Sequence, residues 1–360
     1  MEPIKNILFS TTRQWNPGDE FILMGILNLM RSVDGNFNPV IFNRNPEIQR
    51  RNSNMCFNFQ IDISRMRVKR LKSGSYDNSF KEKFLNERFI DLAVFAGTPE
   101  WGSPRLKIMY EYIQRYSIPV VYLGIGLGDS KFDVSQLNDT YRSVLKKAKL
   151  ITVRDRLCAA VLSQFNPVFL PCPALLSASR DSEKNITQVK KVGLIYSSDK
   201  SIKYNKVDQK THSFTMDLYR RFLEKYANQF DIEFICHYVD ELPEICKDFD
   251  SVRYHYSYDA SQYLGIYNKF DLVIGTRVHG MGIAASMGIP GIYIQHDVRA
   301  DTCEGFCTEI IKADSAFEDI FKIFDLKLRQ VSQINKEILE YKTKAFQKYQ
   351  DLLRPILKAI

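Results

Sequence analysis

Short runs of consecutive apolar residues, separated by stretches with helical spacing, recur along most of the 360-residue chain. Unbroken apolar runs are typical of parallel strands that are buried on both faces, whereas half-exposed strands alternate. Parallel neighbours also need a crossover between them, which is usually a helix. The expected strands are 4–10, 38–43, 91–97, 118–126, 149–155 and 166–171, followed by 191–198, 230–237, 271–276 and 290–295. The pattern therefore predicts doubly wound α/β architecture.

One polar, charged stretch interrupts this alternation, and the chain is long for a single core. We interpret the interruption as a linker between two α/β domains that face a ligand cleft. A long, helix-favouring tail follows the second domain. The expected boundaries are 1–176 for the first domain, 177–190 for the linker, 191–315 for the second domain and 316–360 for the tail, which we expect to pack across both domains. In open parallel sheets the binding crevice lies beyond the carboxyl ends of the strands, so functional residues are expected in the loops there.

Composition and charge exclude several classes of function. The formal net charge of +8 is mild for this length and suits an anionic small molecule or a glycan as readily as nucleic acid. No motif that recognises nucleic acid occurs, so we expect no nucleic-acid partner. No apolar run has the roughly 18 to 20 residues that span a bilayer, and no secretory signal is visible. The 7 cysteines include no C-x-x-C pair, which favours a cytoplasmic protein with reduced thiols.

The loop after the first expected strand reads TTRQWNPGDEF (11–21). Pro17-Gly18 is a turn dipeptide, and Asp19 can cap the helix that follows. The plain interpretation is a well-capped junction between strand and helix. The functional interpretation is a polar loop that presents Asn16 and Asp19 to the cleft, and the residues alone leave both open.

Two later loops also carry unusual residues. Gly124, Gly126 and Gly128 alternate after the strand at 118–126, so the backbone there can come close to a ligand or to a neighbouring domain. This spacing is not the G-x-G-x-x-G of dinucleotide-binding proteins. Arg154 follows the strand at 149–155, and Asp155 beside it can cap the next helix. An arginine at a strand end, next to a helix N-terminus, is also suited to binding an anion.

The stretch DLVIGTRVHGMGIAASMGIPGIYI (271–294) is the most unusual part of the sequence. Arg277 and His279 follow an apolar strand and would point to the same side if the chain stayed extended. Gly280 and Gly282 remove side chains where a ligand or backbone must approach. No G-x-S-x-G elbow and no zinc-binding spacing of histidines occurs, which disfavours a serine hydrolase or a zinc enzyme. Because of its place at a strand end, we favour a functional role for His279 over a structural one.

Together these motifs resemble the polysaccharide pyruvyl transferase family. The resemblance is carried, in order along nearly the whole chain, by NPGDE (16–20), VYLGIGLG (121–128), ITVRDRLCAAVL (151–162) and the stretch 271–294. It implies two domains with a fold like that of the GT-B glycosyltransferases, and it implies no metal and no resident cofactor. It also implies an activity, the transfer of a pyruvyl group from phosphoenolpyruvate to two sugar hydroxyls as a cyclic ketal.

The resemblance also suggests roles for individual residues. Arg154 and Arg277 would bind the anionic groups of the donor, and His279 would be the general acid and base. Arg299, in the segment HDVRAD (296–301), would be a further donor-binding cation, and Gly280 would also belong to the donor-binding site. Residues that would orient the acceptor are Asn16, Asp19 and Gly126. Two segments depart from the family pattern, since AGTPEW (96–101) replaces a glycine-rich segment and Cys172 stands where an aspartate is common.

Two other functions use the same features. A glycosyltransferase with a nucleotide-sugar donor would bind a diphosphate with these residues and release a nucleotide in place of phosphate. A non-catalytic glycan-binding protein could keep the scaffold, although the intact Arg154, Arg277 and His279 count against it. The basic, amphipathic tail at 336–360 favours a helix packed on the domains over a surface helix on an anionic membrane. A lipid-linked acceptor would still bring the protein to the inner face of a membrane.

Overall fold

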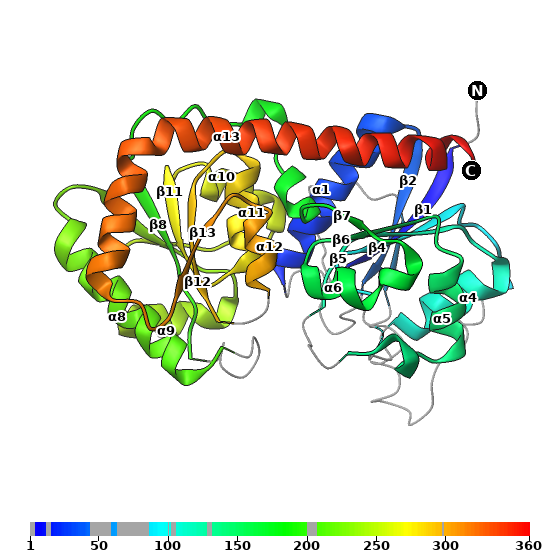
Figure 1. Cartoon of the computed structure of the whole chain (residues 1–360), viewed down its shortest axis with the longest axis horizontal. Helices are drawn as coiled ribbons and strands as arrows, with labels where there is room; N and C mark the ends of the chain where they lie inside the picture. Colours follow the sequence, from blue (N-terminus) through cyan, green and yellow to red (C-terminus); the bar gives the residue numbers. More distant parts are fainter. Residues whose placement is uncertain are drawn as a thin grey trace. The chain divides into compact units, whose positions relative to one another are not determined.

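The computed structural model describes residues 4–11, 16–43, 59–62, 86–99, 101, 106–127, 132–199, 207–296 and 299–360. The chain divides into two compact units. Unit 1 comprises residues 1–173 and 346–360, and unit 2 comprises residues 174–345. Each unit is built on one sheet whose strand pairs are all parallel, with helices packed against it (Figure 1). The predicted doubly wound architecture and the long C-terminal helix are confirmed.

The sheet of unit 1 has seven described strands in the order β3-β2-β1-β4-β5-β6-β7. The direction of strand addition reverses between β1 and β4. Right-handed crossovers then place helix α1 on one face and α4, α5 and α6 on the other, as Figure 1 shows. The strands are β1 (Lys5–Thr11), β2 (Phe37–Asn43), β3 (Phe59–Asp62), β4 (Leu92–Ala96), β5 (Val120–Ile125), β6 (Leu150–Val153) and β7 (Val168–Phe169), and the helices are α1 (Pro17–Val33), α4 (Lys107–Tyr116), α5 (Asp139–Lys146) and α6 (Arg156–Val161).

The sheet of unit 2 repeats this topology with six described strands in the order β10-β9-β8-β11-β12-β13. Its reversal lies between β8 and β11, which places α8 and α9 on one face and α10, α11 and α12 on the other (Figure 1). The strands are β8 (Lys191–Ile195), β9 (Asp231–Ile235), β10 (Tyr254–His255), β11 (Leu272–Gly275), β12 (Gly291–Gln295) and β13 (Glu309–Lys312), and the helices are α8 (Gln209–Tyr226), α9 (Leu242–Asp248), α10 (Tyr263–Tyr267), α11 (Val278–Ser286), α12 (Ala300–Glu304) and α13 (Phe317–Lys358).

The consecutive apolar residues of the strands are buried because helices cover both faces of each sheet. Every residue of β4 is buried, and one of them, Phe95, stacks on Tyr122 and Tyr110 with ring centroids 4.5 and 4.7 Å apart. Tyr110 lies on the buried side of α4, so the helix and two strands share one aromatic core. Such offset aromatic pairs add to the stability that area burial alone supplies.

Two expected boundaries differ from the structure. Helix α1 begins at Pro17, and its cap is Asn16, whose side chain accepts a hydrogen bond from the Gly18 N–H at 3.1 Å. The prediction that Asp19 caps this helix is therefore wrong, because Pro17 has its φ preset for the first helical position. The strand expected over 166–171 is confined to β7, since the prolines that follow cannot donate ladder hydrogen bonds.

Helix α13 is fastened to the polar stretch that we interpreted as a linker. Lys342 Nζ donates to the carbonyl oxygens of Ala178 and Ser286, at 2.9 and 2.7 Å, and to the Glu183 carboxylate at 2.8 Å. Asn335 adds a bond to the Lys184 carbonyl oxygen at 3.0 Å. In this way a segment with few apolar residues is ordered by polar contacts. Within the described ranges, no helix is both long enough and apolar enough to cross a bilayer, α13 included.

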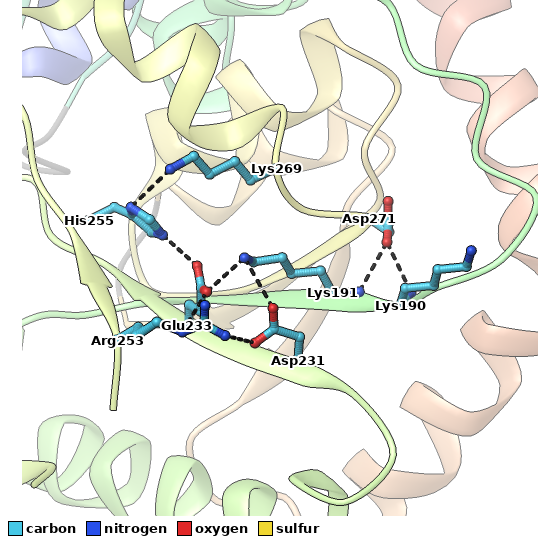
Figure 2. A network of polar contacts seen from close by, with 8 residues as sticks. All are labelled: Lys190, Lys191, Asp231, Glu233, Arg253, His255, Lys269 and Asp271. Carbon is cyan, nitrogen blue, oxygen red and sulfur yellow. Dashed lines mark hydrogen bonds and ion pairs between the residues drawn. The ribbon is translucent and has the colours of Figure 1, made fainter. Parts of the chain in front are cut away.

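A buried carboxylate organises the charged residues on one side of the unit 2 sheet (Figure 2). Glu233 on β9 is 1% exposed and pairs with Lys191 Nζ at 2.7 Å, Arg253 Nε at 3.0 Å and His255 Nε2 at 2.5 Å. Burial acts to raise the pKa of Glu233, but the hydrogen bonds from Lys191 and His255 lower it overall. The network therefore ties β8, β9 and β10 together through one ionised side chain.

We expect the replacement Glu233→Gln to destabilise the protein at neutral pH by roughly 1–3 kcal/mol, because charge-assisted bonds are lost. A carboxylate whose pKa is lowered by folding contributes stability above its unfolded pKa, about 4.5, and loses that contribution as the pH falls further. The difference between wild type and variant should therefore shrink below about pH 4.5 in urea unfolding at several pH values. Asp217→Asn is the control, since its pair with Arg220 is exposed. An equal loss in both variants would contradict the assignment.

Candidate functional site

The reversal of strand order in unit 2 defines where a ligand crevice is expected. Strands β8 and β11 are neighbours there, with Ile195 paired to Gly275 at their carboxyl ends. The Tyr219 hydroxyl contacts both strand ends. It donates a hydrogen bond to the carbonyl oxygen of Ile195 at 2.8 Å and lies 3.4 Å from the carbonyl oxygen of Ile274. Crevices at such switch points are the usual ligand sites of doubly wound sheets. The segments that leave β8 and β11 are therefore the candidate site.

Arg277 follows β11 directly and is held by two groups from the loop after β9. Its guanidinium forms an ion pair with the Glu241 carboxylate and lies over the ring of Tyr238, 4.3 Å from the centroid. The carboxylate also accepts the backbone N–H groups of His237 and Tyr238, at 2.8 and 3.0 Å. The Arg277 side chain is only 10% exposed and that of Glu241 is 1% exposed. The guanidinium is thus fixed in one orientation.

Burial disfavours the charged form of both residues in this pair. For Arg277, burial acts to lower the pKa, but Glu241 and Tyr238 raise it overall. For Glu241, burial raises the pKa, although Arg277 and two backbone N–H groups act in the opposite direction. Because the carboxylate accepts three N–H donors, we treat the two side chains as an ion pair. Sequence reasoning missed Glu241, and its only signal was its position shortly after a strand end.

A second buried pair, His237 and Tyr267, lies close to the start of α11. His237 Nε2 lies 2.8 Å from the Tyr267 hydroxyl, and burial together with nearby Arg277 lowers the pKa of His237 well below its usual range. A Cβ added to Gly280 would lie 2.7 Å from that hydroxyl and 2.9 Å from Ile195 Cδ1. Gly280 is therefore required by the close approach of Tyr267 and of β8. Because Gly280 has no side chain, the start of α11 can pack directly against the end of β8.

The sequence suggested an extended chain from Arg277 to His279, but the structure has a helix there. Helix α11 begins at Val278 with Arg277 as its N-cap residue, so His279 is the second residue of the helix. The small residues that follow allow the chain to turn into a closely packed helix at once. Both side chains nevertheless belong to the N-terminal end of α11, where backbone N–H groups lack helical partners and favour an anion.

Arg299 follows β12, the strand next to β11. Its Nη2 lies 3.2 Å from His296 Nε2, and His296 Nδ1 lies 3.2 Å from the Tyr293 hydroxyl. A guanidinium can only donate, so His296 Nε2 accepts and the ring proton resides on Nδ1. Arg299 thereby contacts the His296 imidazole at the carboxyl edge of the sheet.

In unit 1, Arg154 follows β6 and is 91% buried, being 9% exposed. Its Nη1 lies 3.6 Å from Cys172 Sγ and would be 3.5 Å from a Cβ on Gly97, at the end of β4. The guanidinium therefore extends toward the end of β4, one of the two strands between which the strand order reverses. Burial acts to lower the pKa of Arg154, but Cys172 and Asp155 raise it overall, with a smaller effect from Asp19. Arg154 therefore keeps its charge although position 172 carries a cysteine and not an aspartate.

The neighbours of Arg154 are fixed by local structure. Asp155 caps α6, accepting the Cys158 N–H at 2.7 Å, and also accepts the Leu127 N–H at 3.2 Å, so the predicted cap is confirmed. A Cβ on Gly126 would lie 2.4 Å from the Asp155 carboxylate and 2.6 Å from Arg154 Nε. Gly126 is thus needed for the packing of these two side chains. Gly128 and parts of 96–101 lie outside the described residues.

Chains of known structure share this fold. S. aureus MnaA in complex with UDP superposes with a TM-score of 0.60 at 12% identity, over 99% of this chain and 98% of that one. UDP-GlcNAc 2-epimerase from Neisseria meningitidis bound to UDP-GlcNAc gives 0.57 at 10% identity, over 97% and 99%. The glycotransferase of kitacinnamycin gives 0.53 at 12%, over 99% of both chains. The fold is therefore that of the GT-B class of glycosyltransferases and epimerases.

The family follows from the sequence itself. The model of the polysaccharide pyruvyl transferase family matches residues 16–298, which include Asn16, Asp19, Arg154, Arg277 and His279. The chain belongs to this family, as its motifs suggested. No curated protein sequence matches the chain.

Proposed function

We propose that this protein transfers a pyruvyl group from phosphoenolpyruvate to two hydroxyls of a glycan or a glycan precursor. The product is a cyclic ketal, and inorganic phosphate is released. The observation that carries the proposal is the N-terminal end of α11 at the switch point of unit 2, where Arg277 is fixed by Glu241 and His279 is two residues away. Membership of the family supports it.

The reaction requires proton transfer but no change of oxidation state. Two hydroxyl oxygens form bonds to the enol carbon, the methylene carbon takes up a proton, and the bond from the enol carbon to the phosphate oxygen breaks. Of the two hydroxyl protons, one ends on the new methyl group and the other on phosphate. We propose that His279 moves these protons, because an imidazole can both accept and donate near neutral pH.

The charge balance of unit 2 suggests how the donor would be held. Glu241 offsets the charge of Arg277, so Arg277 would act mainly as an oriented hydrogen-bond donor. The attraction for an anion would come from the N–H groups at the start of α11 and from Arg299. Arg154 in unit 1 is also proposed to bind an anion, and Asn16, Asp19 and Gly126 to orient the acceptor. The proposal involves no metal and no cofactor apart from phosphoenolpyruvate as co-substrate.

A glycosyltransferase with a nucleotide-sugar donor is the second candidate. It is favoured by the solved structures of the same fold that contain UDP or UDP-GlcNAc. The two candidates differ in the product that leaves the donor, which is inorganic phosphate in one case and a nucleotide in the other. A lipid-linked acceptor is proposed for the first candidate, and such an acceptor would place the reaction at the inner face of a membrane.

The test is the release of phosphate from phosphoenolpyruvate in the presence of glycan acceptors, lipid-linked ones included. We expect release that depends on the acceptor, and we expect His279→Ala to abolish it while binding of phosphoenolpyruvate, measured by calorimetry, is retained. Lys322→Ala is the control, because Lys322 is exposed on α13, pairs with exposed Asp319 and has no proposed catalytic role. Phosphate release at the wild-type rate by His279→Ala would remove this residue as the acid and base.

If no acceptor elicits phosphate release, and a nucleotide sugar but not phosphoenolpyruvate raises the melting temperature, the nucleotide-sugar candidate replaces the first. That outcome would leave the fold and the placement of Arg277 unchanged. It would change only the donor that these residues bind.

A further inference from the structure

We propose that the hydroxyl groups of Ser197 and Thr276 bind an oxyanion of the donor at the switch point of unit 2. This inference rests on the proposed function and adds two residues to it. Sequence reasoning did not single out either residue, because serine and threonine are common after strands.

The two residues lie at the ends of neighbouring strands. Ser197 is two residues beyond the end of β8, and Thr276 is the first residue after β11 and directly precedes Arg277. Because Ile195 and Gly275 are paired in register, Thr276 is level with Tyr196 and Ser197 follows one residue later, so both residues lie at the same end of this strand pair. The start of α11 follows Thr276 within two residues.

Both hydroxyls are buried and, among the residues that the structure describes, lack a hydrogen-bond partner. Ser197 and Thr276 are each 3% exposed, and in the described part of the chain neither hydroxyl oxygen has a partner. Arg277 Nε, on the adjoining residue, is also buried and unpartnered among the described residues. A buried polar atom left unpaired lowers stability, and each such atom in a native protein calls for an explanation.

Two other buried hydroxyls of unit 2 are satisfied within the protein, whereas that of Thr302 on α12 has no partner among the described residues. Thr215 donates to the Thr211 carbonyl oxygen at 2.7 Å, and Ser286 donates to that of Ile283 at 2.7 Å. These two side chains lie inside helices, away from the strand ends. Ser197 and Thr276 differ from these two side chains in standing at the strand ends of the switch point, where a ligand is expected.

The chemistry of these groups selects the ligand. Two hydroxyls, the Arg277 Nε–H group and the N–H groups at the start of α11 are all donors, which together suit a small oxyanion. Phosphoenolpyruvate carries two such groups, a phosphate and a carboxylate. The hydroxyl oxygens of Ser197 and Thr276 are shielded from solvent. Binding of an oxyanion therefore requires each side chain to rotate about its Cα–Cβ bond.

The test compares Ser197→Ala and Thr276→Val with Thr215→Val, by titration calorimetry and thermal unfolding. Each of the first two variants should bind phosphoenolpyruvate roughly ten- to a hundredfold more weakly than wild type, since a hydrogen bond to a charged group is lost. Their melting temperatures without ligand should be unchanged or higher, because an unsatisfied group is removed. Thr215→Val should show the reverse, a lower melting temperature and unchanged affinity.

Inorganic phosphate and pyruvate, titrated separately, distinguish the two oxyanions. Weaker binding of phosphate alone, or of pyruvate alone, in both variants would support the site and identify the group that it binds. Lower melting temperatures with unchanged affinities would overturn the inference by showing a structural role.

The remaining outcomes separate this inference from the proposed function. If wild type binds phosphoenolpyruvate and releases phosphate, and both variants match it, the inference fails while the function stands. If wild type binds only UDP-GlcNAc, and the variants bind it more weakly, the oxyanion site stands while the pyruvyl donor fails. If wild type binds none of these probes, both are overturned.

Discussion

Arg277→Lys is expected to lower kcat/KM for phosphoenolpyruvate by roughly 100-fold or more. The guanidinium is planar and is held by Glu241 on one side and by the ring of Tyr238 on another, so its remaining donors point in fixed directions. A lysine ammonium keeps the charge but cannot reproduce the two-pronged geometry or the stacking. Loss of one preorganised donor at a developing charge commonly costs a factor of about 100 to 1,000.

The measurement is acceptor-dependent phosphate release as a function of phosphoenolpyruvate concentration. Arg220→Lys is the matched control, because Arg220 lies exposed on α8, where it pairs with exposed Asp217 and lies over the ring of Phe249, 5.8 Å from the centroid. Its kcat/KM should equal that of wild type. Full activity of Arg277→Lys would show that charge alone suffices at this position, and the oriented-donor role would be abandoned.

Glu241→Leu is expected to lower the free energy of unfolding by about 3–5 kcal/mol. This replacement leaves the Arg277 guanidinium buried without its carboxylate, and it also removes the acceptor of two backbone N–H groups. Breaking a buried ion pair at one partner is costly because an uncompensated charge stays behind. Urea unfolding followed by circular dichroism measures the loss.

The double variant Glu241→Leu with Arg277→Met should recover a large part of that loss, since apolar residues can replace a buried ion pair at little cost. It should remain inactive, because Arg277 is absent. Stability and activity would then separate, as expected of a pair whose role is to position a side chain. A double variant less stable than Glu241→Leu would contradict this account.

The arginines that the sequence analysis singled out share one property, their place in a segment that follows an apolar strand. Arg154, Arg277 and Arg299 all follow strands of the sheets, where the analysis expected them. The rule worked because strand ends can be located from apolar runs. It did not reveal what surrounds each side chain, and it misjudged the path of the chain after Arg277.

The partners of Arg277 show what such a rule leaves out. Glu241 is 36 residues away in the sequence, and Tyr238 comes from the same distant loop. Tyr267, which explains Gly280, belongs to another element, α10. No local pattern marks these residues, because they meet only when β9, β11 and α10 are assembled around β8. The helix cap at Asn16 was missed for a local reason, since Asn16 and Asp19 are both good capping residues.

The two doubly wound units, the long final helix and the strand ends that carry arginine were predictable from the sequence alone. These follow from apolar runs and helical spacing, which are local consequences of burial on one or both faces. Only the tertiary structure decided which charges are paired and which polar atoms are left unsatisfied. Those properties depend on which side chains burial brings together across the sheet, and burial sets both the strength of an ion pair and the cost of an unpaired hydroxyl.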